Sequence, residues 1–192
     1  MTSSDSVNLW YSTYPGKAPK YLGRRDNPLA GKFPRMNLIT QENAPHHLSQ
    51  LSNGMGESLT SYRYNSMAGS GSFVYVVDAG LFKPREGNGD LARSGLYRGS
   101  HGPPEEYSAY ENDLYSDNKH GNLIAALAVN NDLGIARKAQ LVSVRVTEGT
   151  GIEFTTEGLV WGILKATDNI VKKQRQRMAV ITISLGKYIC GL

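Results

Sequence analysis

Cysteine is almost absent from this sequence, and so is any long apolar run. The one cysteine, Cys190, excludes a disulfide within the chain and a zinc site built from several cysteines, so it does not define a redox compartment. No stretch approaches the roughly eighteen apolar residues of a membrane span, and residues 1–17 lack the apolar core of a secretory signal. Taken as a complete chain, the sequence predicts a soluble, cytoplasmic protein.

Charge of one sign is in small excess only. The sequence has 21 lysine and arginine residues against 17 aspartate and glutamate residues, and the resulting net charge of +4 identifies no partner. The densest basic run is Lys172, Lys173, Arg175 and Arg177. Because it falls where a helix is predicted to end, interaction with the helix dipole is the simpler interpretation. The tyrosines are not interleaved with basic residues, so we expect no nucleic-acid binding, and we expect no membrane partner.

The remaining composition is that of one globular domain. Forty per cent of the 192 residues are hydrophobic, which is enough for one sizeable core. Residues 1–42 hold four of the eight prolines and no sustained apolar period, so we expect an extended, poorly structured N-terminal arm there. Residues 43–192 are then the folded part.

Three short apolar runs predict the strands of a parallel sheet. They are residues 73–78 (FVYVVD), 140–146 (QLVSVRV) and 179–184 (AVITIS). The first is apolar on both faces, which is typical of a buried parallel strand. Because helical patterns separate the last two runs, we expect an α/β fold with right-handed crossovers.

Two helices and one long connection complete the prediction. Residues 120–131 are apolar almost all round, which predicts a buried helix that stops near Gly134. Residues 155–173 predict an amphipathic helix. Its apolar stripe consists of Leu159, Ile163, Ala166 and Ile170. Residues 83–119 are polar and predict a long surface connection.

Asp78 closes the first predicted strand and is a candidate site residue. Carboxylates are rarely enclosed without a partner, and in open parallel sheets binding sites form at the carboxyl ends of the strands. The alternative is that Asp78 only caps a turn with Ala79 and Gly80, because Asp-x-Gly is a common turn sequence.

His120 begins the first predicted helix, where its ring can lie beside the strand ends. The alternative is an ordinary polar residue at a helix start, since a single histidine seldom indicates catalysis. Together with Asp78 it indicates more. An acid that holds a histidine in one tautomer and stabilises its imidazolium is half of a device that activates a nucleophile, and a serine hydroxyl would be the other half.

Several segments of the chain resemble the subtilase family of serine endopeptidases, in its proteinase K branch. They are NAPHHLSQLS (43–52), SYRYNSMAGSGSFVYVVDAGL (61–81), HGNLIAALAVNNDLGIARKAQLVSVRV (120–146) and AVITISLG (179–186). The order of aspartate before histidine is that of subtilisin. The resemblance spans residues 43–186 and about the first half of a family catalytic domain. It implies a subtilisin-like parallel sheet with flanking helices, incomplete at its C-terminal part.

The resemblance also implies roles for individual residues. Asp78 and His120 are similar to the aspartate and histidine of the catalytic triad. One side of the peptide cleft corresponds to Gly149, Thr150 and Gly151, and the opposing edge to Ser184, Leu185 and Gly186. A substrate would lie between them as an added strand held by main-chain hydrogen bonds. The alternative for these six residues is ordinary strand-end and turn composition.

The sequence departs from the family pattern in two places. After His120 the family usually has Thr-His and then Ala-Gly, whereas this chain has Asn122, Leu123 and Ala126 at the departing positions. The chain also has no counterpart of the oxyanion-hole asparagine and no Gly-Thr-Ser-Met-Ala nucleophile segment. The nearest match, residues 66–68, precedes the aspartate strand, and we reject it as the nucleophile.

These observations support two hypotheses of different class. The first is a subtilase endopeptidase present as a truncated chain, inactive alone because the nucleophile is missing. The second is a pseudoprotease that binds peptides or proteins without cleaving them. A non-functional, degraded gene is a third reading. The family's calcium ligands lie mostly outside the matched part, so we predict no metal and no cofactor in this chain.

The resemblance has consequences for location and association. Family members are largely exported, so the resemblance implies an extracellular protein, whereas a complete chain without a signal peptide would be cytoplasmic; both alternatives stay open. In the family the 179–184 strand lies inside the sheet. A chain that stops soon after it would leave an apolar edge uncovered, and we therefore expect either aggregation or association with a partner through that edge.

Overall fold

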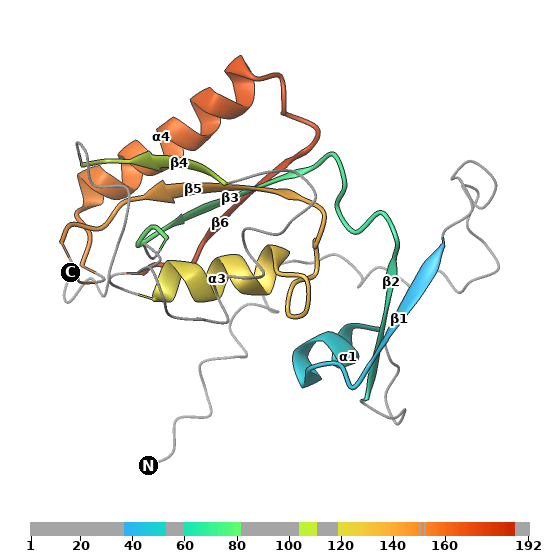
Figure 1. Ribbon diagram of the computed structural model, residues 1–192. Helices are drawn as coiled ribbons and strands as arrows, with labels where there is room; N and C mark the ends of the chain where they lie inside the picture. The colour runs from blue at the N-terminus through green and yellow to red at the C-terminus, as the bar shows by residue number, and fades with distance from the viewer. Residues whose placement is uncertain are drawn as a thin grey trace, which may run out of the picture. The chain divides into compact units, whose positions relative to one another are not determined.

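The computed structural model describes residues 37–52, 60–81, 104–110, 119–149, 151 and 153–186 (Figure 1). The chain divides into two units, residues 1–36 and 37–192, and every described element belongs to the second. In chain order the elements are β1 (Leu38–Glu42), α1 (His46–Ser52), β2 (Ser61–Asn65), β3 (Phe73–Asp78), β4 (Glu105–Ser108), α3 (His120–Val129), β5 (Gln140–Arg145), α4 (Thr156–Lys172) and β6 (Ala179–Ile183).

The main sheet has four parallel strands in the order β4-β5-β3-β6. Phe73 at the start of β3 lies opposite Gln140 of β5 and Ala179 of β6, so the three apolar strands begin level with one another. The predicted α/β fold with a parallel sheet is confirmed, and each predicted strand ends within one residue of the observed one.

Side-chain alternation along the strands builds a separate core on each face of the sheet. Val76 and Leu141 belong to the core that includes the inner face of α3, whereas Tyr75, Val77 and Val142 belong to the core beneath α4. Figure 1 shows the two helices on opposite faces. The continuous apolar runs of β3 and β5 follow from this double burial.

Helix α4 approaches the sheet through small residues. A Cβ atom at Gly162 would collide with Cγ1 of Val146, so only glycine allows the observed contact. The buried residues of the helix are Gly158, Gly162, Ala166 and Asn169. Of the predicted apolar stripe, Leu159, Ala166 and Ile170 pack in the core beneath α4, whereas Ile163 is 36% exposed. Small residues make the closest approach to the sheet, while Leu159, Trp161 and Ile170 are partly buried and pack against the same core.

Helix α3 also differs from the prediction. It was expected to be buried all round, but Leu123 is 61% exposed and Leu127 is 46% exposed. The buried face is formed mainly by small residues, Gly121, Asn122, Ala125, Ala126 and Val129. The helix stops close to the predicted Gly134, whose N–H donates to the carbonyl of Asn130 at 2.8 Å.

Strand β4 lies within residues 83–119, which the sequence predicts as a surface connection. The prediction is wrong for this part, since β4 pairs in parallel with β5. Its sequence, EEYS, is polar and only half-buried, as suits the strand at this end of the described sheet. Residues 82–103 and 111–118 lie outside the described part.

A polar cluster holds the starts of the strands together. Glu105 accepts a hydrogen bond from Arg175 at 2.7 Å and another from Lys173 at 2.7 Å. Burial by itself would raise the pKa of Glu105, but the hydrogen bonds and positive charges of Arg175 and Lys173 outweigh it and lower that pKa to about 2. The basic run predicted to suit the helix dipole therefore also ties the end of α4 to β4. Lys172 pairs with Asp168 one turn earlier.

The smaller sheet consists of β1 and β2, which pair antiparallel. Its core is formed by Ala44, Leu48 and Tyr62. The guanidinium of Arg137 lies 4.4 Å from the centre of the Tyr64 ring and donates from Nε to the carbonyl of Gly134 at 2.9 Å. Strand β1 includes the last residues of the predicted arm, while residues 1–36 are outside the described part, so the prediction for the arm stays untested.

None of the helices in the described part of the chain is both long and apolar enough to span a membrane.

Candidate active site

Asp78 is a buried carboxylate at the carboxyl edge of the sheet. It is the last residue of β3 and is 0% exposed. Its Oδ1 accepts a hydrogen bond from the N–H of Ala79 at 2.7 Å, and the chain then turns through Gly80 with φ +83°. The turn predicted as the alternative role of Asp78 is therefore present. The turn does not prevent Oδ1 of Asp78 from accepting a second hydrogen bond.

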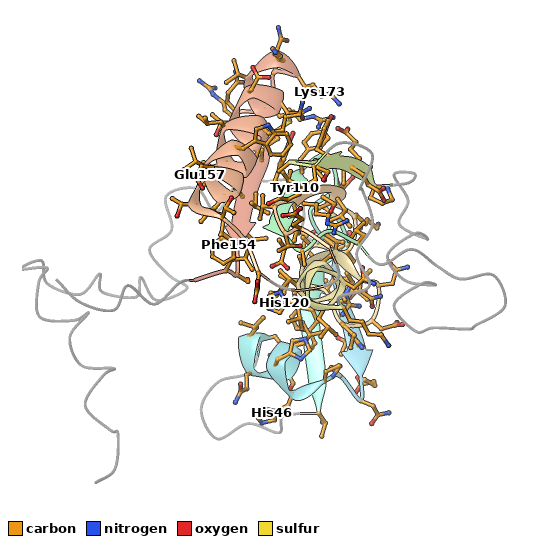
Figure 2. All side chains as sticks on the ribbon, turned by 90° about the vertical axis from the view of Figure 1, so that its left-hand side faces the viewer. His46, Tyr110, His120, Phe154, Glu157 and Lys173 are labelled. Carbon is orange, nitrogen blue, oxygen red and sulfur yellow. The ribbon has the colours of Figure 1, made fainter. Side chains whose placement is uncertain are left out.

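His120 supplies that second bond from the first turn of α3. Its Nδ1 lies 2.7 Å from Oδ1 of Asp78, and the imidazole is 37% exposed while the carboxylate side chain is 1% exposed. Figure 2 labels His120 at the start of its helix. The proton of this bond belongs on Nδ1, because the carboxylate can only accept. In the neutral imidazole the lone pair is then on Nε2.

Gly121 explains how α3 comes close enough to β3 for this contact. A Cβ atom at Gly121 would collide with the carbonyl oxygen of Gly80, so any larger residue would force the helix start away from the strand end. The glycine of HG at the helix start and the glycine of DAG at the strand end thus lie in direct backbone contact. Neither glycine was singled out from the sequence as a contact residue.

The second carboxylate oxygen of Asp78 is also buried. Within the described part of the chain, Oδ2 has no hydrogen-bond partner. A buried carboxylate with one bonded oxygen is costly unless its charge interacts with something nearby. The hydrogen bonds that Oδ1 accepts from the Ala79 N–H and the His120 Nδ1–H offset part of that cost.

The predicted cleft residues come after the two strands that flank β3. Gly149 and Gly151 follow β5 and are exposed, whereas Thr150 lies outside the described residues. Ser184, Leu185 and Gly186 follow β6; Leu185 packs against the core beneath α4 and the other two are exposed. Because β3 is between β5 and β6, the two sets leave the sheet on either side of the strand that ends in Asp78.

A cavity of about 300 Å³ adjoins the loop after β5. Its lining residues are Tyr110, Glu148, Gly149, Glu153, Phe154 and Thr155. Figure 2 labels Tyr110 and Phe154, which come from the end of β4 and from the segment before α4. Of the six, only Gly149 was predicted. Thr155 could have been noticed as a threonine directly before a predicted helix, which is a typical N-cap residue. In the structure its Oγ1 accepts a hydrogen bond from the N–H of Gly158 at 2.9 Å.

The described residues form no cluster of three or more histidine, cysteine, aspartate or glutamate side chains that could hold a metal ion.

The chain is similar in sequence and in structure to known subtilisin-like proteases. The model of the subtilase family matches residues 69–190. Alkaline protease 1 of Aspergillus clavatus is 33% identical over 150 residues, which are 78% of this chain and 34% of that protein. The alkaline proteinase of Hapsidospora chrysogena is 30% identical over 156 residues, which are 81% of this chain and 35% of that protein. The chain thus spans about a third of the length of these relatives.

A solved structure shows the same fold. The crystal structure of a cold adapted subtilisin-like serine proteinase superposes with a TM-score of 0.53 and 24% sequence identity, covering 76% of this chain and 47% of that one. The similarity concerns the parallel sheet and its flanking helices.

Proposed function

Because the chain belongs to the subtilase family, we propose that it represents part of a serine endopeptidase in which Asp78 and His120 act as the acid and the base. The observation that carries the proposal is the 2.7 Å contact between His120 Nδ1 and the buried Oδ1 of Asp78. It lies at the carboxyl edge of a parallel sheet, where such sites form.

The proposed chemistry follows from the arrangement of the two side chains. Asp78 holds His120 with its proton on Nδ1 and stabilises the imidazolium that forms when Nε2 takes a proton. In the proposed reaction Nε2 accepts the proton of a serine hydroxyl as its oxygen attacks the peptide carbonyl. It then gives that proton to the leaving amine, which produces an acyl-enzyme. Water later hydrolyses the acyl-enzyme by the same route.

The proposed substrate is an extended stretch of peptide or protein. It would lie between the loop 149–151 and residues 184–186, paired with their main chain as an added strand. Two features support this placement. The loops leave strands on either side of β3, and Gly149 lines a cavity of about 300 Å³ that could take a side chain of the peptide.

We propose further that residues 1–192 alone do not cleave peptides. The sequence contains no Gly-Thr-Ser-Met-Ala segment and no counterpart of the oxyanion-hole asparagine. Loss of one oxyanion donor typically costs about 10² to 10³ in turnover, and without a nucleophile no acyl-enzyme can form. The serine would have to come from polypeptide beyond the sequence described here.

A peptide-binding protein without catalysis is the second candidate. It is favoured by the segment after His120, where Leu123 replaces the family's second histidine and is 61% exposed. A long apolar side chain there cannot exchange protons or hydrogen bonds with the site. The same fold and the same cleft would then bind a peptide and leave it intact.

A fluorophosphonate probe, which labels activated serines, tests the endopeptidase hypothesis. Residues 1–192 are expected to remain unlabelled and to leave casein intact. A protein extended along the reading frame to a Gly-Thr-Ser-Met-Ala-like segment is expected to be labelled and to digest casein. A reading frame without such a segment would end this hypothesis. The second candidate would then be tested by the fluorescence anisotropy of a labelled peptide.

A further inference from the structure

Arg145 is the largest fully buried side chain of the described residues. It is the last residue of β5 and is 0% exposed. A guanidinium stays protonated in proteins, and a buried charge is costly unless it is paired or hydrogen-bonded. The hydrogen bonds of this guanidinium therefore offset the cost of burying its charge, and they restrain the groups that accept them.

The guanidinium binds the loop that follows its own strand. Nε donates to the carbonyl of Thr147 at 3.0 Å, and Nη2 donates to the carbonyl of Gly149 at 2.5 Å. The chain thus curls around the head of Arg145, and Gly149 adopts φ +59° in doing so. Glu148 and Gly149 line the cavity described above, so the backbone of that wall is fixed by two bonds from one side chain.

The stem of the same side chain supports the turn after Asp78. Arg145 lies opposite Asp78 in the register of the two parallel strands, so both side chains point to the α3 face. A Cβ atom at Gly80 would lie 2.9 Å from Cδ of Arg145, so the turn rests directly on the methylene groups. Gly80 in turn contacts Gly121, the neighbour of His120.

We infer that Arg145 is a positioning residue that couples the Asp78–His120 pair to the wall of the peptide cleft. Its stem fixes the turn on which the pair depends, and its head fixes the 147–149 loop. Lysine cannot replace it, because an ammonium lacks the planar fork that reaches two carbonyls at once. The inference rests on the proposed function in naming the loop as a peptide-binding wall.

Arg145→Lys, with Arg137→Lys as the matched control, tests the inference. Arg137 is also buried, at 8% exposure, and also donates from Nε to a carbonyl, but it acts on the turn after α3. Amide hydrogen exchange of residues 1–192 is the first readout. In Arg145→Lys we expect exchange at residues 146–149 to quicken about tenfold, with residues 130–134 unchanged. In Arg137→Lys we expect the reverse.

The second readout is binding of a fluorescein-labelled tetra-alanine peptide. We expect Arg145→Lys to weaken it about five- to tenfold and Arg137→Lys to leave it unchanged. If the lysine variant shows no cooperative unfolding, Arg145→Gln, which removes the charge, takes its place. Absence of peptide binding by the unaltered chain would refute the proposed function. The amide hydrogen exchange at residues 146–149 would still show whether Arg145 fixes the loop. Unchanged exchange at residues 146–149 in both Arg145 variants would overturn the inference.

Discussion

Single residues set the geometry of the candidate site. The contact between Asp78 and His120 depends on a backbone approach that only glycine permits, because a Cβ atom at Gly121 would meet the carbonyl oxygen of Gly80. The identities of Asp78 and His120 could be predicted from their places at a strand end and a helix start. The role of Gly121 could not, because it depends on the distance between two elements that are far apart in the sequence.

Gly121→Ala should therefore destabilise the fold, against the usual preference of helices for alanine. Alanine normally improves a helix position by about 0.5–1 kcal/mol over glycine, but overpacking here should cost on the order of 1–3 kcal/mol. Urea unfolding followed by circular dichroism measures the difference. Gly186→Ala is the control, since no atom lies within 4 Å of its added Cβ. Equal stability of the two variants would contradict the close approach.

The positions of most helices and strands could be predicted from the apolar pattern of the sequence, but the contacts that α4 and β4 make could not. Apolar runs located β3, β5, β6, α3 and α4, because burial on both faces of a sheet leaves a strong sequence signal. They did not give the rotation of α4, since Gly162 approaches the sheet and Ile163 does not. Strand β4 was missed because its polar residues are stabilised by Arg175 and Lys173, from beyond the end of α4.

The Glu105 cluster makes the strand starts sensitive to acid. In the folded protein the pKa of Glu105 is about 2, below the ordinary value of 4.5, so the ionised form of Glu105 stabilises the fold. This contribution is complete above pH 4.5 and is lost as the pH falls towards 2. Because the side chain is 26% exposed, solvent screening reduces it to about 1–2 kcal/mol.

Glu105→Gln checks this dependence. The variant should be less stable than the unaltered chain at pH 7, and the gap should narrow as the pH is lowered towards 2. Urea unfolding at several pH values gives the two curves. Asp168→Asn, which breaks only the exposed pair with Lys172, should cost less than about 0.5 kcal/mol. A constant gap between the Glu105 curves would show that its charge is not involved.

At the scale of the whole molecule, the described sheet has an apolar strand at one end. Strand β6 pairs with β3 on one side, and within the described residues no strand pairs with its other side. Val180 is 63% exposed and Ile183 is 41% exposed, although the strand sequence AVITI is that of a buried strand. Association through this edge was predicted from the sequence and remains a prediction.

Val180→Lys tests that association. A charge on an apolar edge strand opposes strand pairing, so the variant should elute from size exclusion at a smaller apparent mass at high concentration than the unaltered chain. Leu123→Lys on the outer face of α3 is the control and should elute as the unaltered chain does. Monomeric behaviour of the unaltered chain at every concentration would refute self-association through β6.

¹⁵N NMR of the histidine rings in residues 1–192 tests the hydrogen bond from His120 to Asp78. His120 should carry its proton on Nδ1, whereas His47, whose Nε2 lies 3.0 Å from the carbonyl of Leu133, should carry its proton on Nε2. In Asp78→Ala the His120 proton should move to favour Nε2 while His47 stays unchanged. The same His120 tautomer with and without the carboxylate would show that Asp78 does not hold the imidazole through this hydrogen bond.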